Sequence, residues 1–101
     1  MNMQKLMQEA QKMQAQLQKD QKELEGTIYE GSSSLVSVKV NGKYEVSEVK
    51  VNIPEGETIE FDDKEMLEDM FMVAMNDALK KIAKDKEKKM GKYGSGLSGL
   101  M

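Results

Sequence analysis

The stretch SLVSVKVNGKYEVSEVKVNI, residues 34–53, decides the fold, because its apolar residues recur at every second position. This period is typical of strands with one buried and one polar face, and the pair Asn41-Gly42 is a turn signal between two such strands. A short first strand over residues 27–30, followed by GSSS (residues 31–34) as its turn, precedes them. We therefore expect a three-stranded antiparallel sheet.

The register of the central hairpin follows from keeping its valines on one face. A three-residue loop with Gly42 at positive φ would place Val38 opposite Tyr44 and keep the apolar residues together. The alternation then slips by one position at Ser47-Glu48. We expect a β-bulge there, since one extra residue would return the following valines to the core face.

A long helix is predicted before the sheet, over residues 2–25, where good helix formers run without Gly or Pro up to Gly26. Its apolar residues recur at heptad spacing, and Asp20 occupies the one missing position. A seam this narrow is typical of a helix that contacts a partner on one side only. The seam consists of Met3, Leu6, Ala10, Met13, Leu17 and Leu24.

A second long helix is predicted after a connecting loop. Asp62 would begin it, with Glu65 completing a capping box and with Phe61 and Met66 in the positions of a hydrophobic staple. The helical pattern continues to about Lys89. The fold class is therefore α+β, in the order α-β-β-β-α, with the sheet flanked by two long helices.

The first half of this second helix carries more apolar residues than one buried face needs. One interpretation is that one side covers the sheet and another meets a second subunit; the alternative is a fully buried helix in a monomer. We favour a homodimer, because a three-stranded sheet is too small to bury both sides. The expected interface residues are Met70, Phe71, Val73, Ala74, Met75 and Ala78.

The chain has 101 residues and is expected to form one domain, residues 1–90, with a flexible Gly/Ser-rich tail, residues 91–101. Its net charge of −3 hides an asymmetry, because residues 80–101 hold seven lysines against two acidic residues. An acidic body thus ends in a basic segment, and such polarity bears on the choice of partner more than the total charge does.

Several function classes are disfavoured by what the sequence lacks. It contains no Cys, His or Arg, which removes thiol and histidine catalysis and the usual zinc motifs. We expect no enzymatic activity, no cofactor and no metal site. The longest apolar run, residues 70–75, is too short to span a bilayer, and the N-terminus lacks the pattern of a signal peptide. We therefore expect a soluble, intracellular protein.

The lysines are the strongest functional lead. Lys5, Lys12 and Lys19 are spaced by seven residues and form a stripe on the first helix away from its seam. Three others, Lys80, Lys84 and Lys88, are spaced by four on the second helix. Two lysine stripes on projecting helices predict contact with phosphates, and the absence of Arg disfavours base-specific readout.

The chain resembles the YbaB/EbfC family of bacterial nucleoid-associated proteins. The resemblance rests on the opening MNMQKLMQEAQKMQAQLQK, on VKVNG at residues 38–42 and on Asn76-Asp77-Ala78 within the second helix. It implies a tweezers-like homodimer that grips duplex DNA, located in the cytoplasm with the nucleoid. By position, the DNA-gripping residues would be Lys5, Lys12, Lys19, Lys22, Lys80, Lys81, Lys84, Lys88 and Lys89.

The runner-up function is a protein-interaction module. In that interpretation the two helices clamp a helix of another protein, and the lysines only keep the arms soluble. The heptad seam of the first helix favours it.

Overall fold

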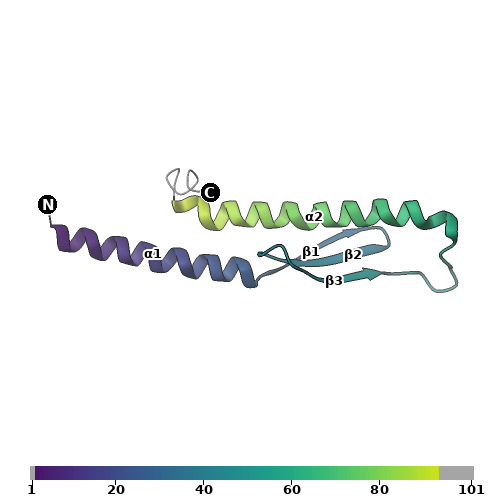
Figure 1. Ribbon diagram of the computed structural model, residues 1–101, viewed down its shortest axis with the longest axis horizontal. Coiled ribbons are helices and arrows are strands. Elements are labelled where there is room, and N and C mark those ends of the chain that lie inside the picture. Colours follow the sequence, from purple (N-terminus) through teal and green to yellow (C-terminus); the bar gives the residue numbers. More distant parts are fainter. Residues whose placement is uncertain (1, 94–101) are drawn as a thin grey trace.

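The computed structural model describes residues 2–93 and has the predicted α+β architecture (Figure 1). Short 3-10 turns precede and follow the last helix, and the molecule is elongated, with extents of 72 × 22 × 15 Å. The elements are α1 (Met3–Gly26), β1 (Ile28–Ser33), β2 (Val36–Asn41), β3 (Val46–Val51) and α2 (Lys64–Met90).

The strands form one antiparallel sheet in the order β1-β2-β3, but the register of the hairpin differs from the prediction. Val38 lies opposite Val49 rather than Tyr44. Asn41 and Glu45 close the loop through a backbone hydrogen bond, so the loop has three residues as predicted but lies two residues later. Both registers keep the apolar side chains on one face of the sheet, so the alternation alone could not distinguish them.

The left-handed residue of this loop is Tyr44, with φ of 66°, and not Gly42. Gly42 serves another purpose, since a Cβ atom there would lie 2.0 Å from the carbonyl oxygen of Leu24. The glycine therefore lets the end of α1 lie directly against the hairpin.

The predicted β-bulge is confirmed. Lys39 pairs with Glu48 and Val40 pairs with Val46, which leaves Ser47 as the extra residue on β3.

The turn between β1 and β2 is shorter than the predicted GSSS, residues 31–34. β1 continues to Ser33, and only Ser34 and Leu35 connect the two strands. Ser34 has a positive φ of 47°. Gly31 instead lies inside β1, where a Cβ atom would lie 2.0 Å from the carbonyl oxygen of Ala74. This glycine allows α2 to approach the sheet closely.

Helix α2 covers one face of the sheet over β1 and β2, and the core lies between them. Small residues of the helix, Ala74 and Ala78, sit against the strands and are fully buried. They are core residues, which corrects their prediction as interface residues. The valines of β2 and Ile82 complete the buried contact.

Helix α2 begins differently from the prediction. Asp63, not Glu65, supplies the capping carboxylate, which accepts a hydrogen bond of 2.9 Å from the backbone N–H of Glu60. Regular α-helix begins at Lys64. Phe61 is 89% exposed, so the hydrophobic staple with Met66 does not form. The end of the helix at Met90 agrees with the prediction.

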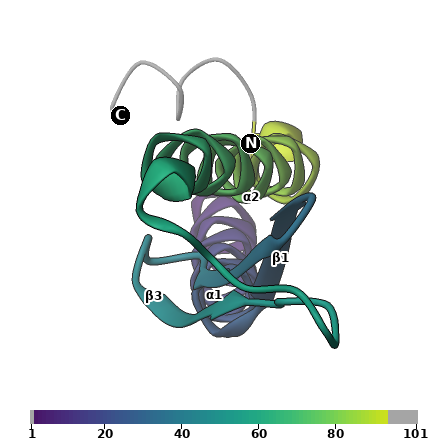
Figure 2. The ribbon, with the colours of Figure 1, turned by 90° about the vertical axis from the view of Figure 1, so that its right-hand side faces the viewer.

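Strand β3 carries an uncovered strip of valines. Val46, Val49 and Val51 lie opposite the buried valines of β2, so they point to the face that α2 covers. They are nevertheless 46–49% exposed, because α2 lies over β1 and β2. Viewed end-on, β3 is at the outer edge of the sheet (Figure 2). We call these three residues the valine strip.

Helix α1 does not flank the sheet; it extends away from one end of it (Figure 1). Only Asp20 and Leu24 of this helix are buried. Residues 2–16 are exposed, including the seam residues Met3 and Leu6. α1 is therefore an arm that is anchored by its last two turns. The predicted tail falls mainly on residues 94–101, which lie outside the described residues.

Candidate nucleic-acid interface

The predicted lysines of α1 are all exposed. Lys19 and Lys22 lie one residue before and two residues after the buried Asp20, which places them about 100° and 160° around the helix from it. They therefore point away from the side of α1 that contacts the rest of the molecule. Lys5 and Lys12 continue the same stripe toward the N-terminus at seven-residue spacing.

On α2, Lys80, Lys84 and Lys88 form an exposed stripe at four-residue spacing. None of these three lysines makes an ion pair with any residue between 2 and 93. Their charges therefore face solvent, although Lys88 lies near enough to Asp85 to help lower the pKa of that carboxyl.

Two further lysines that were predicted to contact DNA are held by the protein itself. Lys81 lies 3.5 Å from Asp77 and donates a hydrogen bond of 2.7 Å to the backbone carbonyl of Glu30. Lys89 lies 3.2 Å from Asp85 and is the less exposed of the two. Their charges are partly neutralised, so they fit phosphate contact less well than the stripe does.

Asp85 also links α2 to the sheet. The hydroxyl of Tyr29 donates a hydrogen bond of 2.5 Å to it. This bond, with Lys89, lowers the pKa of Asp85, while burial and the same contact raise the pKa of Tyr29 to about 12. The pair fixes α2 at the end of the sheet nearest α1, within the part of α2 that carries the lysine stripe.

A polar cluster that the sequence reasoning missed joins the two helices. Asp20 of α1 accepts hydrogen bonds from Gln16, at 3.0 Å, and from the hydroxyl of Tyr93, at 2.5 Å. Its carboxylate also lies 2.8 Å from Lys92, whose ammonium lies over the ring of Tyr93. The missing position of the heptad seam was the only sign of this cluster in the sequence. We call these four residues the Asp20 cluster.

The cluster has a clear electrostatic signature. The hydrogen bonds from Lys92 and then from Tyr93 lower the pKa of Asp20 to about 2, against the opposing effect of burial. Asp20 in turn raises the pKa of Lys92. The 3-10 turn that follows α2 therefore contacts α1 through a charged pair. The sequence had suggested that this end of α2 projects freely.

Comparison with known proteins identifies the family of this arrangement. A model of the YbaB/EbfC DNA-binding family matches residues 1–97. The chain belongs to this family. Nucleoid-associated proteins from Chloroflexus aurantiacus and Ligilactobacillus salivarius are 43% and 39% identical to it over 102 residues, covering 99% of this chain and 99% and 95% of theirs.

The fold is also that of a solved structure. The crystal structure of an uncharacterized protein from Helicobacter pylori matches with a TM-score of 0.70 and 22% identity, covering 93% of this chain and 99% of that one. At this identity the match concerns the fold alone. The YbaB/EbfC family is a family of nucleoid-associated DNA-binding proteins and not a known enzyme family.

In this YbaB/EbfC chain, a hollow of about 360 Å³ lies where α1, the β2–β3 loop and α2 meet. Leu17, Leu24 and Met90 form apolar walls, and Lys43 and Lys86 line it as well. These two lysines were not among the predicted DNA-binding residues. They add positive charge to the junction of the two arms, where Glu25 is the one acidic residue between positions 2 and 93 that lines the hollow.

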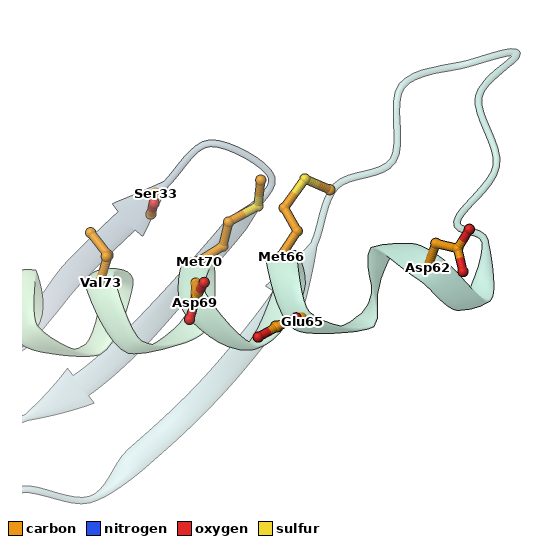
Figure 3. Close-up of a pocket in the computed structure, with 7 residues that line it drawn as sticks. All are labelled: Ser33, Asp62, Glu65, Met66, Asp69, Met70 and Val73. Atoms are coloured by element: carbon orange, nitrogen blue, oxygen red, sulfur yellow. The ribbon is translucent and has the colours of Figure 1, made fainter.

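The opposite end of α2 is acidic. An open hollow there is lined by Met66, Met70 and Val73 on the side of the β1–β2 turn and by the carboxylates of Asp62, Glu65 and Asp69 (Figure 3). Carboxylates at the start of a helix are favoured by its dipole. Because they repel phosphate, this end of the YbaB/EbfC fold does not suit nucleic acid, and the positive charge gathers at the other end.

Two expectations concern what the described residues lack. Within residues 2–93, no group of three or more acidic side chains is arranged to hold a metal ion. Neither long helix in that part of the chain is long and apolar enough to cross a membrane.

Proposed function

We propose that this chain is a nucleoid-associated protein that binds duplex DNA as a homodimer through lysine-bearing helical arms. The observation that carries the proposal is the exposed stripe Lys80, Lys84 and Lys88, which makes no ion pair within residues 2–93, in a chain of a DNA-binding family. The exposed lysines of α1 extend the same charge along the second arm. Lys81 and Lys89 contribute less, since each is paired.

The binding has low sequence specificity. Lysine is a point charge that contacts phosphate, whereas bidentate readout of guanine depends mostly on arginine, which the chain lacks. Binding of this kind suits organisation of the chromosome or modulation of expression at many sites. The protein acts in the cytoplasm, on the nucleoid, without catalysing a reaction.

The homodimer forms through the valine strip and the neighbouring side of α2. Asp77 and Lys81 bind β1, so residues two positions away from them, Met75 and Leu79, lie on the opposite side of α2, toward β3. Phe71, one turn before Met75, shares that side and is 41% exposed. A second copy that covers this surface would bury the valine strip.

The predicted interface residues thus divide between two sides of α2. Phe71 and Met75 belong to the proposed interface, whereas Met70 and Val73 line the acidic hollow beyond β1. The proposed interface also includes Leu79 and the valine strip, which were not predicted.

The proposal is tested by fluorescence anisotropy of a labelled duplex across a salt series. Phosphate contacts by lysine predict that log affinity falls linearly with log salt concentration, with a slope of about −0.9 for each phosphate neutralised. Duplexes of unrelated sequence should bind equally well. No binding at low salt would refute the proposal.

A second candidate is the helix clamp. The exposed seam residues Met3, Leu6 and Met13, which are 45–70% exposed, favour it. It predicts that a partner protein, and not DNA, protects α1 from proteolysis. Protection by duplex DNA alone would exclude it as the main function.

A further inference from the structure

We propose that the Asp20 cluster is a positioning device, which fixes the spacing between the two lysine arms and so sets the geometry with which they meet DNA. The effect on DNA binding rests on the proposed function, whereas the fixed spacing of the two arms does not. The first step is placement. Asp20 lies in the heptad seam of α1, and Lys92 and Tyr93 form the 3-10 turn that follows α2, so the cluster joins the two arms directly.

The second step is burial. Asp20 is only 6% exposed, although the rest of α1 before it is exposed apart from the half-buried Leu17. A buried carboxylate is costly unless its oxygens are satisfied, and here an ammonium, a phenol and an amide satisfy them. A polar group buried in an otherwise apolar seam selects one register, because any sliding of α2 along α1 leaves the charge unpaired.

The third step is charge. Asp20 neutralises Lys92 between the two lysine stripes. If the only task of the arms were to gather positive charge, this carboxylate would weaken them. A positioning role explains why a negative charge lies between two lysine stripes. It predicts that loss of Asp20 weakens DNA binding, whereas charge alone predicts that the same loss tightens it.

The test compares two variants with the same charge change on the same helix. Asp20→Ala removes the cluster, whereas Glu23→Ala removes an exposed carboxylate one turn away that makes no ion pair within residues 2–93. We expect Asp20→Ala to weaken duplex binding by about threefold to tenfold, because the two arms must then be ordered when DNA binds. Glu23→Ala should leave binding unchanged or tighten it, because it only adds positive charge.

Arm spacing is measured directly by spin labels. The chain has no cysteine, so Gln8→Cys on α1 and Ala83→Cys on α2, both exposed, can be labelled cleanly and diluted with unlabelled chain. We expect a narrow distance distribution that broadens in Asp20→Ala and, to a smaller extent, in Tyr93→Phe, which removes one of the three bonds to Asp20 without any charge change. Circular dichroism checks that both variants keep their helices.

Distances that stay narrow in both variants, or DNA binding that tightens in Asp20→Ala as in Glu23→Ala, would overturn the positioning role. A native chain that binds no DNA would instead overturn the proposed function. In that case the distance measurement alone still decides whether the cluster holds the arms in place.

Discussion

At the scale of single residues, two glycines decide how closely the helices approach the sheet, and ion pairs decide which lysines remain free. Gly31 leaves room for the backbone of α2 at Ala74, and Gly42 leaves room for the end of α1 at Leu24. Both glycines have ordinary negative φ, so their value lies in the missing Cβ atom. Among the lysines near the end of α2, Lys81, Lys89 and Lys92 pair with Asp77, Asp85 and Asp20. The lysines of the stripe make no ion pair within residues 2–93.

The close approach at Gly31 can be measured. Gly31→Ala puts a Cβ atom 2.0 Å from a backbone oxygen, so the helix must shift, and we expect a loss of about 1–3 kcal/mol in the free energy of unfolding. Gly26→Ala is the matched control, since nothing lies within 4 Å of its Cβ position. Urea unfolding should find it neutral. Equal losses in both variants would contradict the close packing of α2.

At the scale of elements, α1 and α2 are anchored in different ways. α2 lies along the sheet and buries Ala74, Ala78 and Ile82, whereas α1 is held only near Asp20 and Leu24. Most of the seam of α1 remains uncovered in the single chain. α1 is thus the less supported arm, and its orientation depends on its last two turns.

A pair of leucine truncations tests this anchoring. Leu24 is 4% exposed and Leu6 is 45% exposed. We expect Leu24→Ala to cost about 2–5 kcal/mol of unfolding free energy, and Leu6→Ala to cost less than about 1 kcal/mol. The measurement is urea unfolding at one protein concentration. A cost for Leu6→Ala as large as that for Leu24→Ala would mean that the seam is covered in the assembled protein.

The elements were predictable from the sequence because their signals are local. The periods of residues 2–25 and 34–53 placed the first helix and the hairpin correctly, and the slip at Ser47-Glu48 located the bulge. The register was not predictable, since moving the loop by two residues keeps every side chain on its face. The capping carboxylate of α2 is Asp63 and not the predicted Glu65, because several acidic residues near Asp62 could fill that role.

The site was predictable in part for the same reason. Spacing identified the stripe of Lys80, Lys84 and Lys88, because residues four apart share a face of a helix. It did not reveal that Lys81 donates a hydrogen bond to the backbone carbonyl of Glu30, or that Lys92 pairs with Asp20, because these partners lie far apart in the sequence. Only the gap in the seam at Asp20 hinted at such a partner.

At the scale of the whole molecule, charge and apolar surface lie in separate places. The acidic hollow is at the start of α2, the free lysines are toward its other end and on α1, and the valine strip runs along β3. Such a separation allows one surface to join two copies while another meets DNA. The dimer and the DNA contact can therefore be tested independently.

The dimer is tested by neighbouring residues on opposite faces of β3. Val49→Asp puts a charge into the valine strip, whereas Lys50→Asp puts the same side chain on the polar face. We expect light scattering to give a mass near twice the single-chain 11.4 kDa for the native protein and for Lys50→Asp. Val49→Asp should shift it toward the single-chain value. A native mass near one chain would rule out the proposed homodimer.

The contact between the lysine stripe and DNA is tested most directly by two double variants compared in one salt series. Lys84→Glu with Lys88→Glu reverses the stripe, and Lys50→Glu with Lys64→Glu makes the same charge change at exposed sites outside it. If the stripe contacts phosphate, the first variant should bind duplex DNA far more weakly, with a salt slope shallower by about two contacts per chain. The second should keep nearly the native slope. Equal effects of the two variants would contradict the role of the stripe.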